Sequence, residues 1–296
     1  MKTASKSGYK LLKKVKDEKF DVDQLHHYDL LILIGIRDLQ VSIIDSKINR
    51  CLFLEDYVLA KVTSYDSLIE VLESVFDNHH LLKAGFWRNV KVAVKNQKFS
   101  LVPSSLFSED SIYDYLKLNC KVNPKLEYLL YFKHLKSNAV NTFTINKKLR
   151  NWLTNTYQNI DIGFIHQSST LIEGVLNQIN KYPDDTVFIY VDRFMLHIVT
   201  TKNKQLEYYN QFAIKKFPDY IKYIMLVMNG LNRDQKTTNV VMWGYIGKQS
   251  THYKEFNKYI KNISFGDRPN FLTFGYNFDE LQDHHYFDTY NLHICE

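Results

Sequence analysis

The sequence predicts an α/β protein with mixed sheets, made of two halves that repeat one order of elements. In each half three strands follow one another through very short connections, and an amphipathic helix and a further strand come next. The two copies begin about 155 residues apart, at Leu30 and at Thr186. A duplication of this kind predicts two lobes of similar architecture.

The first copy depends on apolar strands and one strongly periodic helix. The segment LLILIGI has the unbroken branched apolar character of a buried strand. The strands of this copy are predicted at 30–36, 38–46, 48–59 and 89–96. Apolar residues in the segment 64–78 have the i, i+3, i+4, i+7 spacing of an amphipathic helix, namely Leu68, Val71, Leu72 and Val75. Ser64 or Asp66 is expected to cap this helix.

The stretch between the copies adds smaller elements. Pro103 ends a strand that begins near 98, and a hairpin is predicted near 126–144. The other expected elements are a short helix at 110–119, a helix at 146–157, a strand at 160–167 and a helix at 168–182. Ser168 or Ser169 is the expected cap of this last helix.

The second copy repeats the meander, and its elements are strands at 186–192, 194–201, 204–214 and 239–243 and helices at 217–232 and 251–262. Pro218 lies near the first turn of one helix, where a missing backbone N–H costs nothing. The C-terminal run DHHYFDTYNLHICE is expected to be a terminal strand with polar edges.

The predicted organisation is a basic flexible tail over 1–25, an N-terminal lobe over 26–184 and a C-terminal lobe over 185–296. The hairpin near 126–144 is an insertion in the first lobe, and Asp184-Asp185 is the most plausible boundary between the lobes.

The net charge of +6 is concentrated at the N-terminus. Residues 1–20 hold seven lysines against two acids, which leaves 31 basic and 30 acidic residues in the rest of the chain. The nearly neutral body lacks the electrostatic footprint of a nucleic-acid-binding protein. The lysine-rich tail can make weak contact with an acidic partner or a membrane surface, although a solvated leader is the simpler interpretation.

The sequence also argues against a membrane-spanning helix, a signal peptide, a disulfide framework and a zinc ribbon. No apolar run approaches the roughly 18 residues that a membrane-spanning helix needs, and the N-terminus lacks the features of a signal peptide. Cys51, Cys120 and Cys295 are far apart, so neither a disulfide framework nor a zinc ribbon is predicted. A cytoplasmic location is the expectation.

The duplicated order of elements is similar to that of the actin-like ATPase fold, in which two ribonuclease-H-like halves close on a nucleotide. It looks especially like the actin-like proteins of cell division and type IV pilus assembly. The segments LLILIGIRDLQVSIIDS, FSLVPSSLF and DTYNLHICE resemble a bacterial family of unknown function, the domain of unknown function 3822. Members of that family are assigned the actin-like fold, so the resemblance implies this fold for nearly the whole body after residue 25.

The resemblance implies three nucleotide-binding loops, and each departs from its pattern. An Asp-x-Gly turn is expected after the first strand, where Leu33-Ile34-Gly35 keeps the glycine and lacks the acid. The second half should repeat this turn, but Asp192-Arg193-Phe194 keeps the acid and places an aromatic ring at the glycine. The third loop should carry small residues, yet Gly244-Tyr245-Ile246-Gly247 contains two large side chains.

Other motifs carry less weight. VVMWGYIGKQS is not a P-loop, because Met242 and Gln249 occupy positions that need Gly and Ser or Thr. Lys248 is expected in solvent, and Ser250 is expected to cap the following helix. The C-terminal run contains residue types that bind metals but has neither Hx3H nor CxxC spacing, so no metal site is predicted. Nuclease chemistry would need carboxylates on the central strand, and that strand has none.

Two functions follow from this reading. The leading one is a non-catalytic scaffold or protein-interaction module with a degenerate nucleotide site, no catalytic residues, no cofactor and an unknown protein partner. The alternative is a divergent ATP-binding protein or ATPase that uses Gly35, Asp192, Gly244 and Gly247 with magnesium. An open cleft that reaches Gly35 and Gly244 would favour the alternative, and a cleft filled by Phe194, Tyr245 or Ile246 would favour the scaffold.

Overall fold

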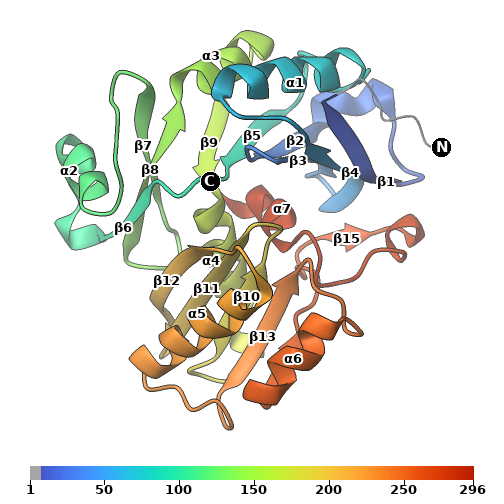
Figure 1. Cartoon of the computed structure of the whole chain (residues 1–296). Coiled ribbons are helices and arrows are strands. Elements are labelled where there is room, and N and C mark those ends of the chain that lie inside the picture. Colours follow the sequence, from blue (N-terminus) through green and yellow to red (C-terminus); the bar gives the residue numbers. More distant parts are fainter. Residues whose placement is uncertain (1–7) are drawn as a thin grey trace.

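A seven-stranded mixed sheet forms the centre of the N-terminal lobe (Figure 1). In this computed structural model, which describes residues 8–296, the path of the sheet is β1-β4-β3-β2-β5-β9, with β15 paired to β4. Its strands are β1 (Tyr9–Lys16), β2 (Tyr28–Ile34), β3 (Asp38–Asp45), β4 (Arg50–Leu59), β5 (Asn89–Val94), β9 (Ile162–His166) and β15 (Thr273–Phe274). β2, β3 and β4 form the predicted antiparallel meander, and β5 and β9 continue the sheet in parallel.

Two helices lie above this sheet in Figure 1, namely α1 (Tyr65–Asp77) and α3 (Lys147–Thr156). Ser64 caps α1 as predicted, because its hydroxyl accepts a hydrogen bond from the backbone N–H of Ser67. Leu68, Leu72 and Val75 are buried on the face that the periodicity indicated.

The second lobe contains a five-stranded sheet with the order β12-β11-β10-β13-β14. These strands are β10 (Val187–Val191), β11 (Met195–Lys202), β12 (Gln205–Ala213), β13 (Asn239–Gly244) and β14 (Asn262–Phe265). β10 lies between an antiparallel neighbour, β11, and a parallel neighbour, β13, as β2 does between β3 and β5. The predicted duplication is therefore present in the topology.

Alternate side chains of β10 face two different helical layers, as the period of a strand requires. Ile189 packs with α5 (Phe217–Gly230) and α6 (Thr251–Tyr259). Phe188 packs instead with the buried helix α4 (Gln167–Asn177) and with Phe287 of α7. Helix α7 (Phe287–Asn291) contacts both α4 and β3, so the two helices lie between the sheets of the two lobes.

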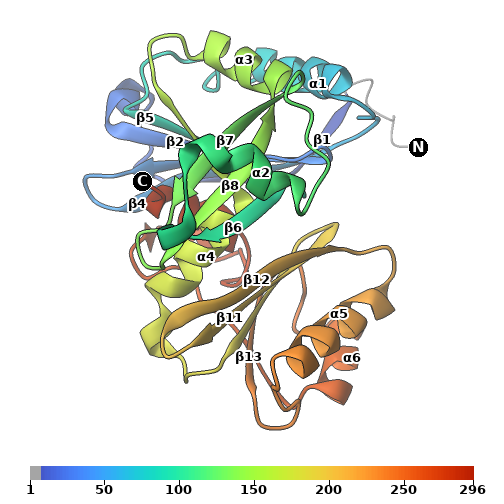
Figure 2. The ribbon, with the colours of Figure 1, turned by 90° about the vertical axis from the view of Figure 1, so that its left-hand side faces the viewer.

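The predicted hairpin is part of a smaller three-stranded sheet, which faces the viewer in Figure 2. Its strands are β6 (Phe99–Pro103), β8 (Ala139–Asn146) and β7 (Glu127–Lys133), and α2 (Ile112–Lys117) packs against it. Short 3-10 helices occur at Val22–His27, Ser104–Leu106, Glu109–Ser111, Ile179–Lys181, Tyr276–Phe278 and Leu292–Ile294. No helix in residues 8–296 is long and apolar enough to cross a membrane.

The prediction of a flexible tail over 1–25 is wrong for the part that the structure describes. Residues 9–16 form β1, which pairs with β4, and Asp17 forms an ion pair with Arg50 at 3.0 Å. Leu25 is buried in the core. Lys13 and Lys14 pair with acidic side chains, which reduces the free charge that this segment could offer to a membrane surface. Residues 1–7 of the predicted tail lie outside the described part of the chain.

The C-terminal segment also departs from the predicted boundary. β15 pairs with β4 of the first lobe, and Leu292 and Cys295 belong to the core of that lobe. The segment that was expected to be a terminal strand instead forms α7 and a 3-10 helix. Tyr286, which directly precedes α7, has a left-handed backbone conformation (φ 58°). The chain therefore returns to the first lobe, and Figures 1 and 2 place the C-terminus near the junction of the lobes.

Candidate functional site between the lobes

The turns that follow β2, β10 and β13 meet at the junction of the lobes. A cleft of about 630 Å³ lies between them, and Gly35, Asp192 and Phe194 are part of its lining. Gly244 is not part of this lining. The cleft therefore reaches two of the three predicted loops. A nucleotide site was expected to have an open cleft that reaches both Gly35 and Gly244, and this cleft reaches only Gly35.

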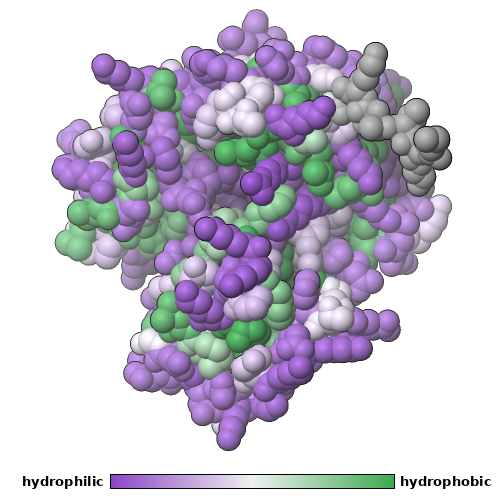
Figure 3. All heavy atoms as spheres, in the orientation of Figure 1, coloured by the Kyte–Doolittle hydropathy of each residue, from purple (hydrophilic) through white to green (hydrophobic). Residues whose placement is uncertain are grey.

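A second hollow of about 410 Å³ lies on the C-terminal lobe, beside the third loop. Its walls are largely aromatic and include Phe217, Tyr220, Tyr245 and Phe256. Phe194 lines both this hollow and the interlobe cleft, so the ring that replaces the expected glycine lies between the two spaces. Figure 3 shows the surface over this region as mostly hydrophilic, with smaller hydrophobic areas on both lobes.

The interlobe cleft contains a buried cluster of charges centred on Lys95, which directly follows β5. The Lys95 Nζ atom lies 2.5 Å from Asp38 Oδ2 and 2.7 Å from Asp192 Oδ2. Asp38 belongs to the first lobe and Asp192 to the second, so one ammonium group joins the lobes. All three side chains are less than a tenth exposed.

Arg193 makes a second bridge between the lobes. Its guanidinium forms an ion pair with Asp56 of β4 and lies 3.5 Å from Asp38. The same group stacks on the Tyr245 ring, with 4.3 Å between the guanidinium carbon and the ring centre. The Tyr245 hydroxyl accepts a hydrogen bond from the buried amide of Gln40, so the third loop is tied to β3.

Helix α7 supplies a third carboxylate, Asp288, which is fully buried. The Tyr190 hydroxyl donates to Asp288 at 2.6 Å, and the Gln167 side-chain amide donates to Asp288 at 2.8 Å and to Asp192 at 3.0 Å. The network therefore extends from both lobes to the C-terminal segment.

Burial and the neighbouring charges shift the pKa values of these acids in different directions. Burial alone would raise the pKa of Asp192, but the Lys95 ammonium and nearby donors lower it to about 2. Burial raises the pKa of Asp38 and of Asp288, and the attraction of Lys95 opposes this rise only in part. Burial acts against the charged form of Lys95, but the surrounding carboxylates raise its pKa above the ordinary lysine value.

The structure shows what surrounds the three glycines of the predicted loops. Gly35 precedes Asp38 in a tight turn in which the Gly35 N–H donates to the Asp38 carbonyl at 2.9 Å, so the first turn does have an acid, three residues after the glycine and five after the expected position at Leu33. Gly244 has φ +97°, and a Cβ at this residue would lie 2.1 Å from the Val191 carbonyl oxygen. Its glycine is thus needed for strand packing, whereas nothing lies within 4 Å of a Cβ placed at Gly247.

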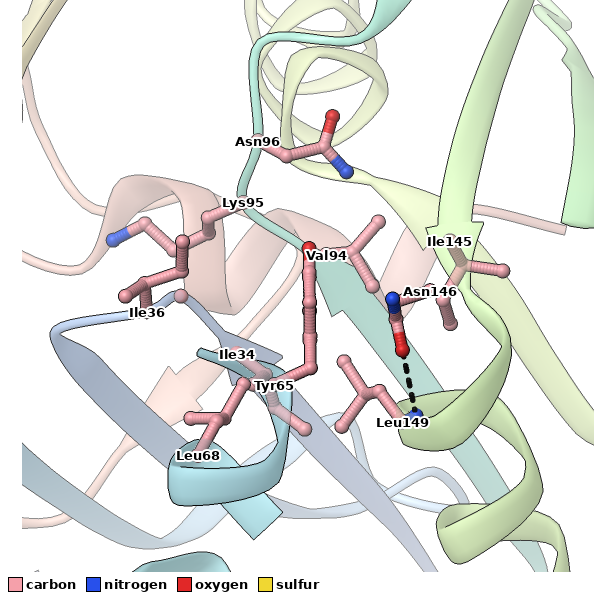
Figure 4. Close-up of a pocket in the computed structure, with 11 residues that line it drawn as sticks. Ile34, Ile36, Tyr65, Leu68, Val94, Lys95, Asn96, Ile145, Asn146 and Leu149 are labelled. Atoms are coloured by element: carbon pink, nitrogen blue, oxygen red, sulfur yellow. Dashed lines mark hydrogen bonds between the residues drawn. The ribbon is translucent and has the colours of Figure 1, made fainter. Parts of the chain in front are cut away.

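A smaller pocket of about 10 Å³ lies behind the Gly35 turn, between α1, β8 and α3 (Figure 4). The Asn146 side chain caps α3 by accepting from the Leu149 N–H at 3.4 Å, which is the dashed line in the figure. Figure 4 shows the Lys95 side chain extending away from this pocket. A space of this size holds about one water, so it is not a ligand site.

Other predicted residues lie where packing explains them. Ser250 caps α6 and Lys248 is exposed, both as predicted. The cap of α4 is His166, not Ser168 or Ser169, because the His166 imidazole accepts from the Ser168 N–H. Residues 8–296 contain no group of three or more His, Cys, Asp or Glu side chains arranged to hold a metal ion.

Sequence reasoning assigned none of Lys95, Asp38 and Asp288 to the site between the lobes. A lysine directly after the apolar segment NVKVAV is a weak signal of a charge at the carboxyl end of a buried strand. The convergence of these residues required the topology, because they come from separate segments of the chain.

Comparison with known protein families gives a match over residues 17–263 to the family described as "Protein of unknown function (DUF3822)". The chain belongs to this family. The resemblance stated from the sequence is thereby confirmed. A comparison with curated protein sequences gave no match.

Solved structures confirm the actin-like fold of this DUF3822 protein. A Bacteroides thetaiotaomicron VPI-5482 protein with an actin-like ATPase fold and unknown function is similar, with a TM-score of 0.77 and 21% identity. The match covers 94% of this chain and 99% of that one. A chain of a PilM-PilN type IV pilus biogenesis complex has a TM-score of 0.60 at 10% identity, over 90% of this chain and 97% of that one.

Proposed function

We propose that this protein is a non-catalytic actin-like scaffold or protein-interaction module whose lobes are joined by its own side chains. The observation that carries the proposal is the position of Lys95, whose ammonium is already held by Asp38 and Asp192 at the meeting point of the loops. Phosphate groups need unoccupied cations or backbone N–H donors at such a place.

The aromatic side chains support the same proposal. Phe194 stands where the second Asp-x-Gly turn would have glycine, and the Arg37 guanidinium stacks on its ring at 4.6 Å. Tyr245 fills the space between Arg193 and the Gln40 amide. A triphosphate that extended from one hollow to the other would have to displace these rings.

A protein partner belongs to this proposal as well. The similar PilM structure is a complex with PilN, which is consistent with the use of this fold for protein interaction. A cytoplasmic location stays a prediction from the sequence.

Thermal melting of the wild-type protein with and without 5 mM Mg-ATP tests the proposal. A ligand at about 100 times its Kd stabilises a protein by about 2.7 kcal/mol, so a site with a Kd near 50 μM would raise Tm by several degrees. We expect no shift with Mg-ATP, Mg-ADP or magnesium alone. A nucleotide-binding actin-like ATPase measured in parallel is the positive control, and a saturable rise in Tm of the protein itself would contradict the proposal.

The second candidate is a divergent ATP-binding protein or ATPase that uses Gly35, Asp192, Gly244 and Gly247. The observation in its favour is that the cleft reaches Gly35 and Asp192 while the aromatic hollow lies beside the third loop. Release of phosphate from radiolabelled ATP above the buffer blank, together with the Tm rise, would select this candidate.

A further inference from the structure

We propose that the Lys95 ammonium is a built-in cation that holds the two lobes together, in place of a divalent cation between Asp38 and Asp192. This inference deepens the proposed function and rests on it, because a lysine that fills the cation position makes the closed arrangement independent of magnesium and nucleotide.

The geometry shows one cation shared by carboxylates of both lobes. Asp38 is the first residue of β3, Asp192 directly follows β10, and Lys95 directly follows β5. Both contacts of the ammonium are shorter than 2.8 Å, and the three side chains are 5, 3 and 9% exposed for Asp38, Asp192 and Lys95. Water therefore contributes little to the neutralisation of these two acids.

The neighbouring cation cannot replace Lys95. The Arg193 guanidinium forms an ion pair with Asp56 and reaches Asp38 only at 3.5 Å. Without Lys95, the buried carboxylates of Asp38 and Asp192 would share a low-dielectric space with no cation between them, and like charges there repel strongly. Closure of the lobes should then become unfavourable.

Loss of the lysine side chain should also make the site sensitive to added cations. The two carboxylates of Asp38 and Asp192 would remain, and hard divalent cations prefer carboxylate oxygens and waters as ligands. Lys95 lines the interlobe cleft, so a hydrated ion has a route to the vacated position. The wild-type protein should lack this response, because its own ammonium already fills the position.

The experiment compares wild type, Lys95→Ala and Lys148→Ala by thermal melting in EDTA and in MnCl2 up to 10 mM, with NaCl at matched ionic strength. Lys148 pairs with exposed Asp66 and is the matched control. We expect Lys95→Ala to lower Tm by roughly 5–10 °C in EDTA and Mn²⁺ to restore part of the loss. Wild type and Lys148→Ala should show neither effect.

A Lys95→Ala protein that melts like wild type, or one that Mn²⁺ stabilises no more than NaCl does, overturns the inference. If Lys95→Ala does not fold, the triple variant Lys95→Met, Asp38→Asn and Asp192→Asn takes its place, because it removes the cation together with both carboxylates that it neutralises. This triple variant should fold and should not respond to Mn²⁺, and its failure to fold would also overturn the inference.

The outcome is separable from that of the nucleotide test. Stabilisation of wild type by Mg-ATP would contradict the proposed function whatever Lys95→Ala shows. A Lys95→Ala protein without a cation response would refute the built-in cation while the absence of nucleotide binding still stood.

Discussion

Asp29 offers a sharp test of the electrostatic reasoning, because its carboxylate links β2 to Arg88 and to His293 near the C-terminus. Arg88 donates to both of its oxygens, at 2.8 and 2.9 Å, and His293 lies 3.4 Å from Oδ2. Burial alone would raise the pKa of Asp29, but the nearby His293 imidazole and the hydrogen bonds and charge of Arg88 lower it to about 2.

The size of the effect follows from the shift of the pKa. A fall from the ordinary 3.8 to about 2 corresponds to about 2 kcal/mol of folding stability at neutral pH, for a side chain that is only 1% exposed. The folded-state pKa is the lower one, so this stability is fully present above the unfolded pKa. It is lost as the pH falls from about 4 towards 2.

The perturbation is Asp29→Asn, and the measurement is urea unfolding at pH values between 7 and 2.5. We expect the free energy of unfolding of the variant to be about 2 kcal/mol lower than that of wild type at pH 5 to 7. This difference should shrink below pH 4. Asp66→Asn is the control, because its ion pair with Lys148 is exposed and should be worth at most about 0.5 kcal/mol. A deficit that stays constant down to pH 2.5, or one no larger than that of Asp66→Asn, would refute the reasoning.

Two further predictions concern the third loop. Tyr245→Phe leaves the buried Gln40 amide without its acceptor and should lower the free energy of unfolding by about 1–3 kcal/mol. Tyr276→Phe is the control, because it removes a hydroxyl from a side chain that is 69% exposed and should leave Tm unchanged. Equal Tm values for the two variants would count against the hydrogen bond between the third loop and β3. Gly244→Ala should cost at least about 2 kcal/mol or prevent folding, because φ is +97° and the new Cβ meets a carbonyl oxygen. Gly247→Ala should stay within about 0.5 kcal/mol of wild type, and similar melting of the two alanine variants would show that the backbone can relax.

Local patterns were enough to predict most elements and the duplication. The helix with Leu68, Leu72 and Val75 on one face formed where the periodicity placed it, and Ser64 caps it. Side-chain spacing and capping are properties of neighbouring residues, so they can be read from the sequence without a three-dimensional model.

The failures have a common physical cause in pairing between distant segments. The lysines of residues 9–16 look like a solvated leader by composition, yet the segment gains its hydrogen bonds from β4, about 40 residues later. The C-terminal run was expected to be a strand, but its residues Asp288 and Tyr290 fit a helix that packs between α4 and β3. Neither partner could be identified from local sequence.

The interlobe site shows how far motif reasoning extends. Compared with the family pattern, each loop lacks one functional group, and the altered nucleotide site that this comparison indicates stays a prediction. The structure supplies the carboxylate of the first turn from Asp38 and a cation from Lys95, which the pattern does not contain.

This replacement changes the energetic question about nucleotide binding. Under the proposed function, a nucleotide with magnesium would have to compete with the ion pairs that Lys95 makes with Asp38 and Asp192. The incoming cation would gain the carboxylates only if the ammonium left them, and the displaced ammonium would then need new partners or water. The tethered cation does not dissociate from the protein, so it pays little entropy for its position, whereas a free ligand loses translational and rotational freedom when it binds. This reasoning favours the internal pair, so removal of the Lys95 side chain should change the response of Tm to divalent cations more than any change in the glycines of the loops.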